Sequence, residues 1–281
     1  MNQECHEAVK AALRAAAGLK LVPPVCAGSF EGSRTGSRTG GSMEFADYRS
    51  YREGDELRRV DWRLYARSEQ LMVRRFAQES DPRCDIIIDC SRSMDFYGKK
   101  AAAAGMGALF AQSALNAGFS LQVWAIHDTL LKMNAPETPE LWELPREGSE
   151  EKEGIFEELR QGLYRNGVRI FISDLFFSLA PGKLMKYLGG SNAVILQILG
   201  EEESAPVLSG SVMISDPESG RSKELLIDEA ALERYRERLA NFRAEYAETV
   251  RARSSSIFFL NASECLREWN LSTFCREGVL Q

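Results

Sequence analysis

The chain has 281 residues, of which 44% are hydrophobic and 27% are charged. This is the composition of an ordinary globular protein, and the length suits one large domain or two unequal ones. The net charge of −6 disfavours a nucleic-acid-binding protein, whose surface is typically basic.

Neither a membrane span nor export is expected. A spanning helix needs about 20 mostly apolar residues. The most apolar stretch, residues 168–179, is interrupted by Arg169 and Asp174. The amino terminus has no apolar core of a signal peptide before Lys10. We therefore expect a cytoplasmic protein.

Cysteine and histidine give no sign of a disulfide framework or a zinc site. The six cysteines contain no C-x-x-C pair, and the chain has only two histidines. We expect free thiols at all six positions. These are Cys5, Cys26, Cys84, Cys90, Cys265 and Cys275.

The first region, residues 1–82, begins with an alanine-rich stretch in which Val9, Leu13 and Ala17 follow helical spacing. Pro23 ends the predicted helix. Residues 32–41 then repeat a Gly-Ser-Arg-Thr unit, which is typical of a loop. A solvated linker is the favoured interpretation, and an arginine-bearing docking loop is the alternative.

Residues 43–76 are rich in arginine, acidic residues and aromatic residues, and the two charge signs alternate. This pattern favours a network of arginine–carboxylate pairs with arginine stacked on aromatic rings. A surface for nucleic acid would carry fewer carboxylates.

The second region, residues 83–281, alternates strands with helices. Strands are predicted at 85–89, 119–126, 130–133, 168–174, 193–199 and 256–260, with a hairpin formed by 211–215 and 223–227. Helices are predicted at 99–117, 155–163, 181–188, 229–253 and 263–276. This alternation predicts an α/β fold: a doubly wound, mostly parallel, Rossmann-like sheet with a smaller, partly β N-terminal region.

Two acidic residues, Asp89 and Asp174, follow predicted strands. In such a sheet, ligands bind at the carboxyl ends of the strands, where the strand order reverses. Asp89 opens the run D-x-S-x-S. Alternate residues of an extended segment point the same way, so Asp89, Ser91 and Ser93 are expected to converge.

One carboxylate and two hydroxyls form an oxygen-only ligand set that suits Mg²⁺, Mn²⁺ or Ca²⁺. Asp174 would add a carboxylate, directly or through water. Because the site carries little charge, its cation would accept a carboxylate from another molecule. The alternative is that Ser91 or Ser93 caps the following helix.

Several segments resemble known families. Residues 86–94 (IIIDCSRSM) and 170–174 (IFISD) resemble the two strands that form the metal-ion-dependent adhesion site of von Willebrand factor A domains. Residues 44–49 (EFADYR), 51–55 (YREGD), 58–62 (RRVDW) and 66–67 (AR) resemble the signature of the bacterial family called domain of unknown function 58. The resemblance extends over most of the chain from about Gly18.

This resemblance implies a von Willebrand factor A-like domain at residues 83–281, preceded by the signature region within residues 1–82. It also implies a non-enzymatic, metal-dependent interaction module, an adaptor or chaperone component acting with a MoxR-type AAA+ ATPase. A client protein would present an Asp or Glu to the metal. The adhesion site normally includes a threonine, and Ser149 is the nearest match in this chain.

Two other functions compete with this one. A metal-dependent hydrolase, resembling a phosphoesterase, would use Asp89 and Asp174 around Mg²⁺. No general base is evident, since His127 stands alone, and neither a P-loop nor a G-x-S-x-G motif is present. A nucleic-acid module working through Arg34, Arg38 and Arg49 is disfavoured by the acidic charge balance.

Overall fold

The computed structural model describes residues 3–22, 44–51, 60–77, 82–145, 153–164, 167–217, 220–269 and 271–281. Contacts divide the chain into two units, Met1–Pro24 with Pro82–Gln281, and Val25–Asp81. We expected residues 1–82 to form one region, but the contacts assign residues 1–24 to the larger unit. Helix α1 (Gln3–Ala15) belongs to the larger unit, because its buried side chains pack against α3.

The larger unit is built on a six-stranded sheet with the order β10-β7-β6-β3-β4-β5. Its strands are β3 (Arg83–Asp89), β4 (Ser120–Ile126), β5 (Leu130–Lys132), β6 (Gly167–Ser173), β7 (Ala193–Leu199) and β10 (Ser256–Asn261). All neighbours are parallel except β5, which runs antiparallel to β4. Apolar runs such as 86–88 and 194–196 are buried on both faces, as parallel strands require. The predicted mixed α/β, Rossmann-like fold is confirmed.

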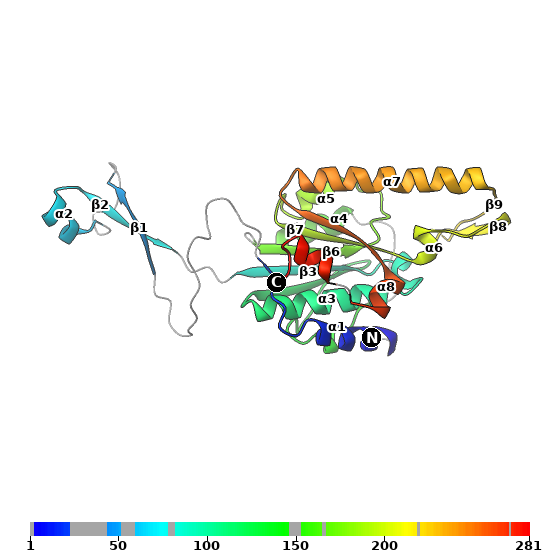
Figure 1. The fold of residues 1–281 in the computed structure, drawn as a ribbon, viewed down its shortest axis with the longest axis horizontal. Coiled ribbons are helices and arrows are strands. Elements are labelled where there is room, and N and C mark those ends of the chain that lie inside the picture. Colours follow the sequence, from blue (N-terminus) through cyan, green and yellow to red (C-terminus); the bar gives the residue numbers. More distant parts are fainter. Residues whose placement is uncertain are drawn as a thin grey trace. The chain divides into compact units, whose positions relative to one another are not determined.

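Helices cover both faces of this sheet (Figure 1). One face packs against α1, α3 (Lys99–Asn116), α8 (Ala262–Arg267) and α9 (Ser272–Arg276). The other packs against α4 (Glu153–Gly162), α5 (Pro181–Tyr187) and α7 (Glu229–Arg251). Helix α3 is buried along nearly its whole length, and its alanines allow α1 to pack closely against it. Within the described residues, no helix is both long and apolar enough to cross a membrane.

The single helix predicted at 263–276 is wrong. The chain forms α8 and α9 instead, and Trp269 lies between them. Its ring packs on α3 so closely that a Cβ at Gly105 would lie 2.2 Å from Trp269 Cη2. The helix breaks where the Trp269 side chain packs on α3. Apolar periodicity alone does not predict this break.

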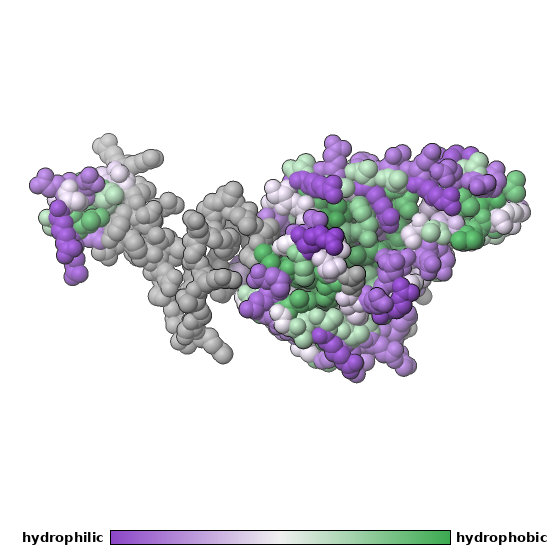
Figure 2. Space-filling view, in the orientation of Figure 1, coloured by the Kyte–Doolittle hydropathy of each residue, from purple (hydrophilic) through white to green (hydrophobic). Residues whose placement is uncertain are grey.

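The predicted hairpin forms outside the main sheet, from β8 (Gly210–Ser215) and β9 (Ser222–Ile227). The short helix α6 (Glu201–Ser204) precedes it along the chain. Exposed apolar side chains, including Met213 and Leu226, lie on the hairpin, and Figure 2 shows hydrophobic residues gathered at this end of the larger unit.

The smaller unit contains β1 (Glu44–Ser50) and β2 (Met72–Ala77), which pair antiparallel, and α2 (Trp62–Ser68). It is partly β, as expected. Asp61 caps α2, because its Oδ1 accepts hydrogen bonds from Arg63 N at 3.0 Å and Leu64 N at 3.1 Å. The loop at 32–41 and most side chains of the expected arginine–carboxylate network lie outside the described residues, so both stay predictions.

Candidate functional site

The strand order reverses at β3, which lies between β4 and β6. After β3 the chain crosses to β4 on one side, and after β6 it crosses to β7 on the other. The loops that leave β3 and β6 therefore diverge. Asp89 ends β3 and Asp174 follows β6, so both carboxylates lie where ligands bind in open α/β sheets.

Asp89 is buried and held by two strands. Its Oδ1 accepts a hydrogen bond from Ser91 N at 2.9 Å, and its Oδ2 accepts one from Ser173 Oγ at 2.6 Å. Ser173 Oγ in turn accepts from Leu175 N at 2.9 Å. The carboxyl ends of β3 and β6 are thus joined through one serine hydroxyl, a contact that no pattern in the sequence predicts.

The Oγ atoms of Ser91 and Ser93 lie 3.2 Å apart, and the backbone N of Ser91 donates to the Asp89 carboxylate. Ser93 lies in the 3₁₀ helix η2 (Arg92–Asp95), whereas the sequence suggested an extended segment. Ser91 occupies the N-cap position of η2 but its side chain makes no capping hydrogen bond, and the N-cap of α3 is Gly98. Helix capping therefore does not account for Ser91.

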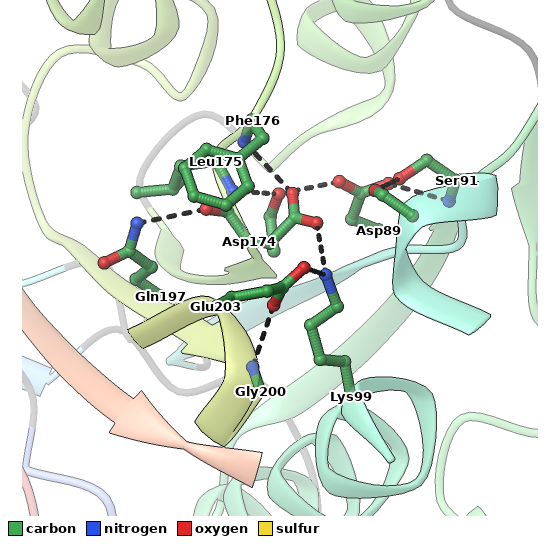
Figure 3. Close-up of polar contacts among 11 residues, drawn as sticks. Asp89, Ser91, Lys99, Asp174, Leu175, Phe176, Gln197, Gly200 and Glu203 are labelled. Atoms are coloured by element: carbon green, nitrogen blue, oxygen red, sulfur yellow. Dashed lines mark hydrogen bonds and ion pairs between the residues drawn. The ribbon is translucent and has the colours of Figure 1, made fainter. Parts of the chain in front are cut away.

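Asp174 is also buried, and its carboxylate is already engaged. Oδ2 lies 2.9 Å from Lys99 Nζ, and Oδ1 accepts a hydrogen bond from Phe176 N at 3.0 Å. Gln197 Nε2 donates to the Asp174 backbone oxygen at 3.0 Å. Figure 3 shows the Lys99 ammonium directed at this carboxylate. The sequence pattern predicts Asp174 at the site but not the lysine that pairs with it.

Lys99 has a second carboxylate partner, because its Nζ lies 2.6 Å from Glu203 Oε1. The other oxygen of Glu203 accepts a hydrogen bond from Gly200 N at 2.8 Å. Burial on its own would lower the pKa of Lys99, but the charges of Asp174 and Glu203 outweigh it and raise the pKa. Lys99 is therefore a buried, charged ammonium.

The sequence carries one signal for this ion pair. Helix α3 opens with Lys99 and Lys100, although the first turn of a helix favours acidic residues. Lys100 pairs with Asp95 of η2. Two lysines at this end of a helix indicate carboxylates nearby in space, even though Glu203 is far away in the sequence.

The oxygens of Asp89, Ser91 and Ser93 suit a divalent cation, whereas the Asp174 carboxylate already has a cationic partner. Asp89, Ser91 and Ser93 offer oxygens only, which fits a hard cation. Asp174 is paired with the Lys99 ammonium in this structure, so a cation held by both aspartates would share the Asp174 carboxylate with Lys99. Across the described ranges, no three His, Cys, Asp or Glu side chains gather in a metal-binding arrangement. Ser149 lies outside the described residues.

Fold and site together define an α/β protein with a Rossmann-like parallel sheet and a carboxylate–hydroxyl cluster at its topological switch point. The family model described as "Protein of unknown function DUF58" matches residues 47–248, and the chain belongs to this family.

The chain is 24% identical over 262 residues to "Uncharacterized protein Rv1480" of Mycobacterium tuberculosis, which covers 86% of this chain and 81% of that protein. The same values hold for "Uncharacterized protein Mb1516" of Mycobacterium bovis. A crystal structure described as an aerotolerance-related membrane protein from Bacteroides fragilis is 12% identical, with a TM-score of 0.37. It covers 66% of this chain and 95% of that one.

Proposed function

We propose that the chain is a non-enzymatic protein-interaction module whose binding site lies at the carboxyl ends of β3 and β6. Asp89, Ser91 and Ser93 would hold a divalent cation there, Mg²⁺ in the first place and Mn²⁺ or Ca²⁺ as alternatives. The observation that carries the proposal is the gathering of one carboxylate and two hydroxyls at the switch point of the sheet. A bound cation would supply a coordination position for a carboxylate of another protein. The larger unit would then work in the manner of a von Willebrand factor A domain.

The surroundings of the site support a protein partner. Arg92, within the D-x-S-x-S run, donates a hydrogen bond at 3.4 Å to the Pro217 backbone oxygen in the turn of the β8–β9 hairpin. This hairpin carries exposed apolar side chains, of which Met213 is 66% and Leu226 75% exposed. Exposed apolar groups beside a polar site are typical of surfaces that bind other proteins.

The proposed partner is a MoxR-type AAA+ ATPase, or a client bound to it, that presents an Asp or Glu side chain. This part of the proposal rests on the resemblance of the D-x-S-x-S run and of the upstream signature to their families. A cytoplasmic location goes with such a partner and stays a prediction.

Titration with Mn²⁺ tests the cation site, with the free ion counted by electron paramagnetic resonance. We expect one ion per chain, and we expect Asp89→Asn and Ser91→Ala to lose it. Asp95→Asn is the matched control, because the Asp95 carboxylate belongs to the same loop but pairs with Lys100. Equal Mn²⁺ binding by all four proteins would contradict the site.

Co-purification with a MoxR-type ATPase tests the interaction. The ATPase needs Mg²⁺ for its nucleotide, so a chelator cannot isolate the effect of the proposed site. The comparison is therefore made at constant Mg²⁺ between the wild type, Ser91→Ala and Asp95→Asn. Loss of capture with Ser91→Ala alone supports the proposal, and undiminished capture with Ser91→Ala refutes a cation-mediated contact.

A further inference from the structure

Lys99 is the one buried lysine in the described residues whose ammonium lies between two carboxylates. Its side chain is 0% exposed, Asp174 is 1% exposed and Glu203 is 21% exposed. Figure 3 shows the three groups in contact, with Lys99 rising from α3, Asp174 at the end of β6 and Glu203 on α6.

The position of this lysine is fixed by the backbone around it. Lys99 is the first residue of α3, and the preceding Gly98 has the positive φ of 71° that turns the chain into the helix. Glu203 is held on the opposite side, because Tyr235 of α7 donates to its backbone oxygen and Gly200 N donates to its carboxylate. The ammonium is therefore built into the fold, like the carboxylates it contacts.

Without its two carboxylate partners, a lysine at this position would cost stability. It opposes the positive end of the α3 macrodipole, and burial of its charge has to be offset by its partners. Both oxygens of Asp174 accept a donor, as both oxygens of Asp89 do, but one donor to Asp174 is the Lys99 ammonium. A divalent cation that used Asp174 as a ligand would have to share this carboxylate with an ammonium of the same charge sign.

We infer that Lys99 is a tethered cation that withholds Asp174 from metal coordination and so sets the affinity of the Asp89–Ser91–Ser93 site. The inference rests on the proposed cation site and adds to it a residue that controls occupancy. With Asp174 withheld, protein oxygens alone retain the ion weakly. A carboxylate from the partner supplies the missing negative charge, so cation and partner bind together.

The test is Mn²⁺ affinity in variants that free Asp174 without changing the charge of the triad. Lys99, Asp174 and Glu203 carry +1, −1 and −1, a sum of −1. In the double variant Lys99→Met with Glu203→Gln, the charges of the three positions also sum to −1, and the whole negative charge lies on Asp174. We expect it to bind Mn²⁺ at least about tenfold more tightly than the wild type, the size of effect that a neighbouring unit charge has on ion binding.

Glu203→Gln alone is the matched control, because Lys99 still pairs with Asp174 there, and it should show no gain in affinity. Adding Asp174→Asn to the double variant should remove the gain. Equal affinity of the wild type and the double variant would overturn the inference. If circular dichroism shows that the Met variant is unfolded, Lys99→Gln with Glu203→Gln takes its place with the same expected direction.

The same titrations separate failure of the inference from failure of the proposed function. The wild type and the double variant could bind Mn²⁺ with equal affinity, and Ser91→Ala could abolish binding in both. That result would support the cation site and refute the role of Lys99. A gain that survives Ser91→Ala would place the ion elsewhere and refute the proposed function. Absence of binding in every protein would refute both.

Discussion

Ser173→Ala should destabilise the larger unit strongly, although the change removes a single oxygen atom. Ser173 Oγ donates to Asp89 Oδ2 at 2.6 Å and accepts from Leu175 N at 2.9 Å, and Ser173 is fully buried. A hydrogen bond to a charged group contributes about 1.5–3 kcal/mol, and a buried N–H left without this partner costs about 1–3 kcal/mol. Because neighbouring losses do not add fully, we expect the free energy of unfolding to fall by about 2–4 kcal/mol.

Ser113→Ala is the matched control. Ser113 is as buried as Ser173, but its Oγ has no hydrogen-bond partner in the part of the chain that the structure describes. Removing it should leave stability unchanged or raise it by about 0.5 kcal/mol, since alanine favours helices more than serine does.

Thermal melting followed by far-ultraviolet circular dichroism measures both variants. A loss of about 2–4 kcal/mol corresponds to a fall in Tm of about 5–10 °C for a domain of this size. Equal Tm values for Ser173→Ala and Ser113→Ala would refute the reasoning, because burial is the same in the two proteins and only the hydrogen bonds differ. The Mn²⁺ affinity of folded Ser173→Ala then reports whether the Asp89 carboxylate needs this hydroxyl to stay in place.

Three further predictions concern the larger unit. Gly105→Ala should lower stability by about 1–3 kcal/mol because its Cβ would overlap the Trp269 ring, and Trp269→Phe should relieve most of this loss in a double-mutant cycle. In a Cys26→Ser background only Cys275 should react with a thiol reagent in the native state, because the other described cysteines are buried; fast reaction of a second thiol would contradict this. Burial raises the pKa of Asp85, so the folded state binds its proton more tightly than the unfolded state and loses stability as pH rises above about 4. The free energy of unfolding of Asp85→Asn relative to the wild type, measured with urea, should therefore be higher at pH 7 than at pH 4. The same relative value at both pH values would count against this prediction.

The sheet could be predicted from the sequence because its strands are short apolar runs that carry their own signal. Residues 193–199, for example, were predicted with the observed bounds of β7. Strand bounds and the location of Asp89 and Asp174 at strand ends follow from local pattern and from the rule for open α/β sheets. The break between α8 and α9 could not be predicted, because it accompanies the packing of Trp269 against Gly105, more than a hundred residues away in the chain.

The contrast between local sequence pattern and contacts between distant residues also explains why the site was predicted only in part. Asp89, Ser91 and Ser93 are close in sequence, so their convergence follows from the backbone that leaves β3. Lys99 and Glu203 meet because α3 and α6 both begin at the carboxyl edge of the sheet, and no local pattern states this. The unfavourable lysine at the start of α3 was the one available signal.

The carboxylates of this edge are held by the fold itself. Asp89, Asp174 and Glu203 each accept a hydrogen bond from a backbone N–H two or three residues away, from Ser91, Phe176 and Gly200. The three loops therefore fix their own acidic side chains, and Lys99 compensates the charge that two of these acids share. We therefore expect the edge to assemble from these contacts alone, and a cation bound at the proposed site would add stability only by mass action. The protein should keep its fold in chelator, and the ion would serve recognition.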